Sequence, residues 1–329
     1  MPTLYLDDQR SSIRVSGQEL IITIGDQERE KIPLAWVERI IIAGNVQIST
    51  QAITVLLKES IPVGFMSTKG NYRGYLQTSL HKNAALRIAQ YDQFRNPEFR
   101  HRQAHSFIEA KVKNCRTVLL KHQRSHSDFH CDMELEGMSR ELHKLKQTPT
   151  IEGLMGHEGV AAHWYFMAFG RMVRKDFSFE TRSRRPPKDP VNALLSLGYT
   201  LLYNEFVTAT EAIGMDSNIG FLHALDYGRS SLASDMVEEF RWLIDGLVLG
   251  LVNKHVVQPS DFERQENGGF KMADQARKKF YEHYEQRMHD EAIYQDMHIS
   301  YRRIFIRQAE HLARVIQMKD QLYDPYLIK

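Results

Sequence analysis

The sequence predicts an α+β protein in which a small, antiparallel N-terminal β domain is followed by a larger, all-α domain. Short runs of β-branched and aromatic residues, separated by turn residues, fill residues 3–77. Beyond about residue 80 the apolar residues recur at helical spacing instead. A chain of 329 residues is too long for one typical core. We therefore expect two domains, residues 1–80 and residues 81–329.

The N-terminal region is predicted to be mostly antiparallel and to carry one helix. Ser16-Gly17 and Gly25-Asp26 supply turn residues between or after the first strands. Ser49-Thr50 is suited to cap a helix over 51–58, because the apolar residues of that stretch fall on one helical face. The expected strands are 4–6, 13–15, 20–24, 37–42, 46–48, 62–66 and 72–76.

The C-terminal region shows helical periodicity throughout, and no second β-rich block interrupts it. It is therefore predicted to form one helical domain, starting at Asn83. Beyond the helical stretch that begins there, further helices are expected at 151–173, 190–212, 230–253, 272–284 and 301–318.

The composition excludes several classes of protein. With 42% hydrophobic and 26% charged residues, disorder is not expected. The longest apolar stretch, 242–252, contains Asp245 and is too short to span a bilayer, so we expect no membrane insertion. The first residues lack an export signal, and Cys115 and Cys131 have no zinc or disulfide spacing. These features predict a protein of the reducing cytoplasm.

The basic residues gather in two blocks although the net charge is only +2. Residues 81–126 hold ten Lys or Arg against three acids, and residues 171–188 hold seven against two. Such blocks suggest an anionic polymer as partner. A solvated helix face or a charged loop explains either block alone equally well.

One histidine precedes a helix that carries two carboxylates near its first turns. Ser230 or Ser231 is suited to cap this helix. Asp235 and Glu238 are three residues apart and share a face, and His223 is close enough in sequence to fold back on them. An imidazole with carboxylate oxygens suits Mn²⁺ or Mg²⁺ better than a closed zinc site. Taken alone, acids placed for the helix dipole and a histidine bonded to backbone explain the pattern better.

A second candidate is Glu158, which lies in an apolar helical segment among Gly and Ala residues. A glutamate is costly to bury there unless a metal, Arg171 or another basic residue pairs with it. His157 and His163 are six residues apart, which does not match the spacing of zinc peptidases.

A third candidate is the basic loop 182–188, which runs into a helix with Asp189 suited as its cap and Pro190 as its first residue. Arginine side chains and helix-terminal amides can hold phosphates in such a loop, although basic loops before helices are common. The chain contains no GxxxxGK[ST], no GxGxxG after a strand and no GxSxG motif.

Together the three segments resemble the CRISPR adaptation integrase family, the DNA-cutting subunits that insert new spacers into a repeat array. The shared motifs, in order, are EGxAA from Glu158, RRPPxDPxN from Arg184, and GFLH…GRxSLAxD…EEFR from Gly220. The three motifs in this order are far more specific than any one of them. The resemblance covers nearly the whole chain, including the order of the two domains.

The resemblance implies a metal-dependent endonuclease and integrase with one Mg²⁺ or Mn²⁺ ion bound by Glu158, His223 and Glu238. Asp235 would be an accessory catalytic carboxylate. The family often has Asp where this chain has Glu238, with Glu239 next to it; helical phase favours Glu238 as the ligand, and we expect Glu239 to face basic groups. Double-stranded DNA is expected to contact Arg182, Arg184, Arg185, Lys188 and Arg229.

The resemblance also implies a homodimer formed through the β domains and a small ferredoxin-like CRISPR adaptation protein as partner. The chemistry would be attack of a 3′-hydroxyl on a phosphodiester, part of prokaryotic antiviral defence. Two alternatives stay open: a structure-selective endonuclease acting on branched DNA in repair, and a non-catalytic DNA-binding scaffold.

Overall fold

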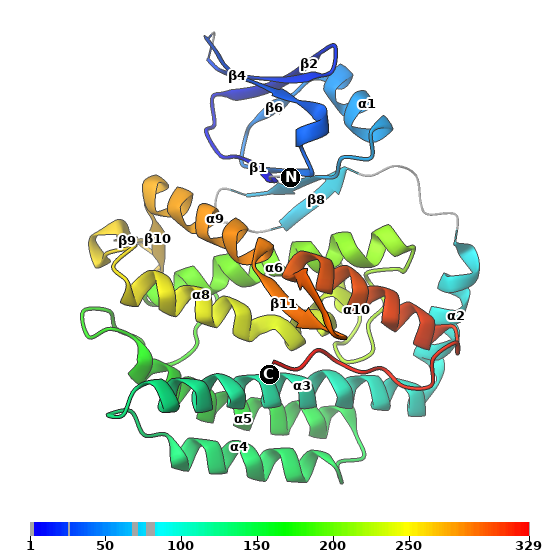
Figure 1. The fold of residues 1–329 in the computed structure, drawn as a ribbon, viewed down its shortest axis with the longest axis vertical. Helices are drawn as coiled ribbons and strands as arrows, with labels where there is room; N and C mark the ends of the chain where they lie inside the picture. Colours follow the sequence, from blue (N-terminus) through cyan, green and yellow to red (C-terminus); the bar gives the residue numbers. More distant parts are fainter. Residues whose placement is uncertain (1–2, 26, 68–71, 77–82, 329) are drawn as a thin grey trace. The chain divides into compact units, whose positions relative to one another are not determined.

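The computed structural model describes residues 3–25, 27–67, 72–76 and 83–328 (Figure 1). The chain divides into two compact units, Met1–His81 and Lys82–Lys329. The boundary expected at residues 80 and 81 lies outside the described residues. An N-terminal β-sheet region is followed by a mostly helical region, as predicted.

The N-terminal unit contains two four-stranded sheets and helix α1. One sheet has the strand order β1-β5-β7-β8 and the other β4-β3-β2-β6. Ser49 caps α1 by accepting a hydrogen bond from the Ala52 amide, as predicted. The elements are β1 (Thr3–Leu6), β2 (Ser11–Ser16), β3 (Glu19–Ile24), β4 (Gln27–Pro33), β5 (Arg39–Ala43), β6 (Gln47–Ile48), α1 (Thr50–Lys58), β7 (Val63–Met66) and β8 (Tyr72–Leu76).

The strand pairing is mixed, so the expectation of a mostly antiparallel domain is wrong in this detail. Pairs β2–β3, β3–β4 and β7–β8 are antiparallel, whereas β1–β5, β5–β7 and β2–β6 are parallel. The turn residues of the sequence indicated the hairpins. Gly17, one of them, lies between β2 and β3 and has φ +60. Parallel strands are joined by long crossover connections, so no local sequence pattern predicts which strands pair in parallel.

Strand β4 was not expected from its residues, QEREKIP. Its side chains are mostly exposed and charged. The strand pairs only with β3 and lies at the edge of its sheet. Charged residues are typical of edge strands, because they discourage pairing with another chain.

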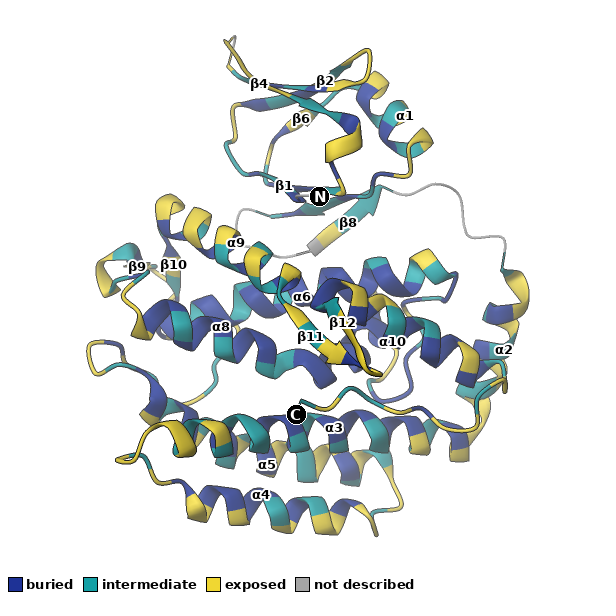
Figure 2. Cartoon of the chain, in the orientation of Figure 1, coloured by how far each residue is buried: buried dark blue, intermediate teal, exposed yellow. Residues whose placement is uncertain are grey.

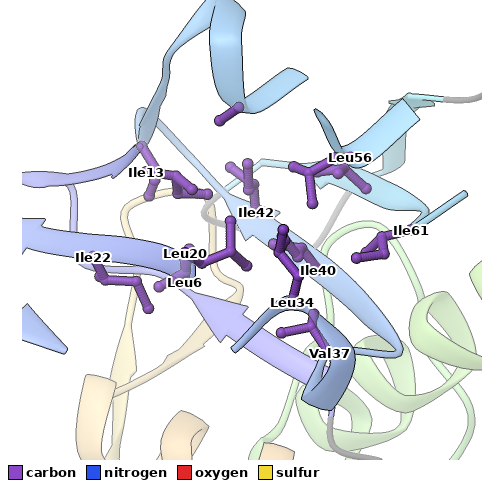
Figure 3. Packing of buried hydrophobic residues seen from close by; sticks show 13 residues of the cluster. Leu6, Ile13, Leu20, Ile22, Leu34, Val37, Ile40, Ile42, Leu56 and Ile61 are labelled. Carbon is purple, nitrogen blue, oxygen red and sulfur yellow. The ribbon is translucent and has the colours of Figure 1, made fainter. Parts of the chain in front are cut away.

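The core of the N-terminal unit is aliphatic (Figure 3). Both sheets and α1 contribute to it, since Leu6 and Ile40 come from one sheet, Ile13 and Leu20 from the other, and Leu56 from α1. All five side chains are buried. This shared core explains why the strands are rich in aliphatic residues.

The C-terminal unit is mainly helical, and its helices alternate buried and exposed faces (Figure 2). Helices α3 and α5 pack against each other, and α3 also contacts the short helix η2. The helices are α2 (Ala84–Arg95), α3 (Pro97–Ser125), α4 (Asp132–Leu145), α5 (Ile151–Met172), α6 (Pro190–Ile213), α7 (Ser231–Val237), η2 (Glu238–Phe240), α8 (Arg241–Asn253), α9 (Asp274–His289) and α10 (Tyr301–Ile316).

Two β-hairpins interrupt the helices, so this unit is not purely α-helical. Strands β9 (Phe262–Arg264) and β10 (Phe270–Met272) form one, and β11 (Glu291–Tyr294) and β12 (Met297–Ser300) form the other. Strands of three or four residues are too short to show a periodic pattern. In the described part of the chain, no helix is long and apolar enough to cross a membrane.

Candidate active site

Lys111 of α3 lies between two of the carboxylates singled out by the sequence. Its ammonium donates to Glu158 Oε1 of α5 and lies 2.6 Å from Glu238 Oε2 of η2. The side chains of Lys111 and Glu238 are 11% and 5% exposed, and that of Glu158 is 24% exposed. Three elements that are distant in sequence thus meet at one cation.

Arg241 holds Glu238 as well. Its Nε and Nη2 donate to Glu238 Oε2 and Oε1, each at 2.8 Å. Burial by itself would raise the pKa of Glu238, but Arg241 and Lys111 outweigh it and lower the pKa below the ordinary range. For Lys111, burial opposes the charged form, and the two glutamates outweigh it and raise the pKa. The Glu238 carboxylate and the Lys111 ammonium are therefore both charged at neutral pH.

Asp235 organises the loop that carries His223. Its carboxylate is completely buried and accepts hydrogen bonds from the backbone amides of Phe221, Leu222 and His223 at 2.5–2.9 Å. Its Oδ1 lies 2.7 Å from His223 Nδ1. Gly220 makes this close approach possible, since a Cβ there would lie 2.6 Å from Asp235 Oδ2.

The Asp235 contact decides which ring nitrogen of His223 is available. When a carboxylate accepts from Nδ1–H, the neutral imidazole carries its free lone pair on Nε2. The imidazole is 16% exposed, and a positive charge on it would help to lower the pKa of Glu238. His223 is thus near enough to Glu238 to interact electrostatically, with Nε2 as its potential ligand atom.

The helix that carries these acids is interrupted where Glu238 stands. Residues 230–253 were expected to form one helix, but η2 separates α7 from α8, and Phe240 departs from helical geometry with φ −118 and ψ 5. A tight 3₁₀ turn inside a helix is typical of functional sites. Glu238, at the start of the turn, contacts Lys111, and Asp235, one turn earlier, contacts the 221–223 loop.

The expectation that Glu239 faces basic groups is wrong. Glu239 accepts hydrogen bonds from the Tyr323 hydroxyl, the Gln308 side chain and the Tyr326 amide. Burial raises its pKa to about 7, although these three donors act in the opposite direction. Glu239 therefore attaches the C-terminal segment to η2, and Glu238 is the carboxylate that faces Lys111.

A cavity adjoins the glutamate–lysine cluster. It is lined by Lys111 and Glu158 together with Arg182, Arg184 and Arg241, among others. Asp245 also lines it and accepts hydrogen bonds from the hydroxyls of Tyr165 and Tyr199. Burial raises the pKa of Asp245 to about 6, opposed by these hydroxyls. Lys111 and Arg241 are paired with the glutamates, so Arg182 and Arg184 are the cations of the lining that favour an anionic ligand.

The expected DNA-binding residues fall into two groups. Arg182 is half-buried. Its guanidinium donates to Asn192 Oδ1 at 2.8 Å and Ser196 Oγ at 3.1 Å, so it braces the loop. Burial lowers its pKa to about 10. The exposed residues, whose side chains are available at the surface, are Arg184, Arg185, Lys188 and Arg229.

Sequence reasoning missed Lys111 and Arg241 as parts of the site, and it named Arg171 as a possible partner of Glu158. Arg171 instead pairs with Glu134 at 2.5 Å. A signal for Lys111 did exist, because Phe107 and Cys115 stand four residues before and after it on the buried face of α3. A lysine in such a row needs a buried acid as partner.

The residues fit a hard divalent cation in their chemistry. Two carboxylates and one imidazole are the donors that Mg²⁺ and Mn²⁺ accept, and the Lys111 ammonium marks a point where positive charge satisfies both glutamates. Within the described residues, no three His, Cys, Asp or Glu side chains are already arranged around one point.

Comparisons with known proteins identify the family to which this chain belongs. The family model described as "CRISPR associated protein Cas1" matches residues 4–286. The CRISPR-associated endonuclease Cas1 1 of Thermodesulfovibrio yellowstonii is 36% identical over 87% of this chain and 91% of its own length. A CRISPR-associated exonuclease Cas4/endonuclease Cas1 fusion of Geobacter sulfurreducens is 35% identical over 99% of this chain, which spans 60% of that protein.

Solved structures share the fold over the full length. A casposase bound to integration product aligns with TM-score 0.90 and 24% identity, over 100% of this chain and 95% of its own. TM1797, a CAS1 protein from Thermotoga maritima, aligns with TM-score 0.84 and 25% identity, over 98% and 99%. A chain of a Cas6-RT-Cas1–Cas2 complex aligns with TM-score 0.85 and 24% identity, over 100% of this chain and 36% of its own. The chain belongs to the Cas1 family of CRISPR-associated proteins, whose curated members are named endonucleases.

Proposed function

We propose that this protein is a metal-dependent DNA endonuclease and integrase that inserts short DNA fragments into a CRISPR repeat array. The observation that carries the proposal is the meeting of Glu158 and Glu238 at one buried cation. His223, whose Nδ1 lies 2.7 Å from Asp235, adds the imidazole. A protein that only bound DNA would have no need to bury two carboxylates together.

Glu158, His223 and Glu238 would hold one Mg²⁺ or Mn²⁺ ion. When bound, the ion supplies positive charge that polarises the scissile phosphate. Arg241 keeps Glu238 ionised and oriented through two hydrogen bonds of 2.8 Å. Asp235 is a positioning residue, because it holds the Nδ1 face of His223 and leaves Nε2 toward the site.

The proposed reaction is a transesterification. The 3′-oxygen of an incoming DNA strand forms a bond to phosphorus, the bond from phosphorus to the existing 3′-oxygen breaks, and the proton of the attacking hydroxyl ends on the departing oxygen. The number of phosphodiester bonds is unchanged, so no external energy source is needed. Water in place of the hydroxyl would make the same site a nuclease.

DNA would bind across the cationic cavity and its rim. Arg184 lines the cavity and is exposed, and the exposed Arg185, Lys188 and Arg229 would contact the backbone of double-stranded DNA. Arg182 would act mainly by bracing the loop, since most of its donors are already used within the protein.

We also propose a homodimer formed through the N-terminal β unit and a small ferredoxin-like CRISPR adaptation protein as partner. Support for a second protein comes from the related chain in the Cas6-RT-Cas1–Cas2 complex. The two free, buried cysteines, Cys115 and Cys131, are consistent with a reducing cytoplasm.

A strand-transfer assay tests the function. Purified protein, supercoiled plasmid carrying a repeat and a short duplex are incubated with Mn²⁺ or Mg²⁺, with and without the small partner. We expect metal-dependent joining that is lost in Glu158→Ala and His223→Ala, while both variants stay folded and still bind DNA. Glu152→Ala is the matched control, because Glu152 is an exposed glutamate on the same helix.

The other outcomes discriminate between the alternatives. Metal-dependent cleavage without joining under every condition would replace the integrase by a structure-selective endonuclease. Binding without cleavage or joining would leave a DNA-binding scaffold. Joining that survives in His223→Ala would refute the assignment of the metal ligands.

A further inference from the structure

Lys111 is the feature of the site that the proposed function does not use. Its ammonium is buried on α3 and touches both glutamates to which we assign the metal: it donates to Glu158 and lies 2.6 Å from Glu238. Ion pairs at the protein surface usually keep one partner in water, whereas here the lysine and Glu238 are both almost inaccessible. Such a pair is costly to form and is therefore not an incidental contact.

We propose that Lys111 is a built-in cation that holds Glu158 and Glu238 together before metal binds and is displaced by the divalent ion. This inference rests on the proposed function, since it assumes that the two glutamates are the ligands. It assigns a role to a residue outside the ligand set, namely to lower the affinity of the site for metal.

The first argument is spatial. A divalent ion bound to carboxylate oxygens lies about 2.0–2.2 Å from them. The Lys111 Nζ is within hydrogen-bonding distance of one oxygen of each glutamate, in the gap between them. An ion that bridges those oxygens would overlap the ammonium, so the two cations exclude each other.

The second argument is electrostatic. In the structure the charges of Glu158 and Glu238 are cancelled by those of Lys111 and Arg241. A divalent ion added to this set would leave two uncompensated positive charges in a largely buried place. If Lys111 leaves, one positive charge remains, and a single DNA phosphodiester neutralises it. Displacement thus links metal binding to DNA binding.

The third argument concerns which cation leaves. Arg241 is bound to Glu238 by two parallel hydrogen bonds, whereas Lys111 is bound as a point charge. Lys111 also lines the cavity beside the site, together with Arg182 and Arg184. Its flexible side chain can turn into that space, where a bound DNA phosphate would receive the ammonium.

Calorimetric titration with Mn²⁺ tests the inference on the purified full chain, without any activity measurement. Lys111→Met should bind Mn²⁺ about tenfold more tightly than the wild type, because no ammonium competes for the glutamates. Without metal, its melting temperature should be lower, since two buried carboxylates lose a counter-charge. Lys113→Met is the matched control: Lys113 is on the same helix, is 44% exposed and pairs with Glu109.

A second measurement uses the wild-type chain, so it does not depend on how well a variant folds. Lysines are acetylated with an amine-reactive ester in EDTA or in saturating Mn²⁺, and each site is quantified by mass spectrometry. Lys111 should be protected in EDTA and become several-fold more reactive with Mn²⁺. Lys113 should react equally in both conditions and serves as the internal reference.

The outcomes separate this inference from the proposed function. If wild type and Lys111→Met bind Mn²⁺ with equal affinity, or if Lys111 stays protected in the Mn²⁺ complex, the displacement is refuted and the metal site stands. If neither protein binds Mn²⁺, both the metal site and the inference fall. Tighter binding in Lys111→Met together with exposure of Lys111 in the wild type supports both.

Discussion

Replacing Asp235 by Asn tests whether this residue acts through His223. Its Oδ2 accepts from the amides of Phe221 and Leu222, and its Oδ1 accepts from the amide of His223 and lies 2.7 Å from the imidazole Nδ1. An asparagine has one acceptor oxygen, and its NH₂ group is a donor. If the NH₂ group faces the amides of Phe221 and Leu222, two donors lose their acceptor. If it faces His223, only the backbone amide does, because the imidazole can change tautomer and accept at Nδ1.

The magnitude follows from the one or two lost bonds. A buried donor left without an acceptor costs about 1–3 kcal/mol, so the variant loses about 1–6 kcal/mol. For a domain of this size each kcal/mol lowers the melting temperature by about 2–4 °C, which predicts a fall of roughly 2–20 °C. Loss of the carboxylate that orients a metal-binding histidine reduces activity about 10–100-fold.

The assay combines thermal denaturation with strand joining at a temperature where the variant is folded. Glu205→Gln is the control, because Glu205 is a buried carboxylate of α6 that pairs with Arg302 of α10. We expect that control to lose stability and keep joining. A wild-type melting temperature in Asp235→Asn would refute the hydrogen-bond account. A wild-type melting temperature with joining abolished as completely as in Glu158→Ala would show that Asp235 acts directly on metal or substrate.

Three further perturbations test other parts of the structure. The double variant Arg184→Ala, Arg185→Ala should bind DNA more weakly, and equally so for all DNA sequences. The slope of log K against log salt concentration should become smaller by about two, as measured by fluorescence anisotropy at several salt concentrations. An unchanged slope would exclude these contacts. Gly220→Ala should destabilise the fold by about 1–3 kcal/mol in chemical denaturation, because its Cβ would meet Asp235 at 2.6 Å; wild-type stability would contradict this packing. Burial raises the pKa of Glu239 from 4.5 to about 7. Between these two pH values the folded chain keeps the proton of Glu239, whereas the unfolded chain has released it. The contribution of Glu239 to the free energy of unfolding is therefore lost as the pH rises through this window. The melting temperature of the wild type should therefore fall relative to that of Glu239→Gln between about pH 5 and pH 7.5, and parallel curves would refute the raised pKa.

Much of the fold was predictable because helices carry their own signals. The cap at Ser49, the start of α6 at Pro190 after Asp189, and the extents of α5 and α10 all agree with the expectations to within about two residues. Periodicity and capping depend on residues three or four positions apart, which a single sequence displays directly.

The candidate residues of the site were also visible in the sequence, because three motifs in a specific order carry them. Their chemical roles were not visible. Helical spacing predicted that Asp235 and Glu238 share a face, but it did not reveal their partners, which are the 221–223 loop for Asp235 and Lys111 for Glu238. Glu239, expected among basic groups, lies instead among hydroxyl and amide donors.

The sequence by itself determined the order of the two regions, the helices and the set of carboxylates and histidine from which a site can be built. Only the tertiary structure decided how strands pair in parallel through long crossovers and which charges meet. Lys111 and Glu158 are 47 residues apart, and Asn114 and Tyr326 are 212 apart. Interactions over such separations depend on how whole elements pack, and local propensity contains no information about them.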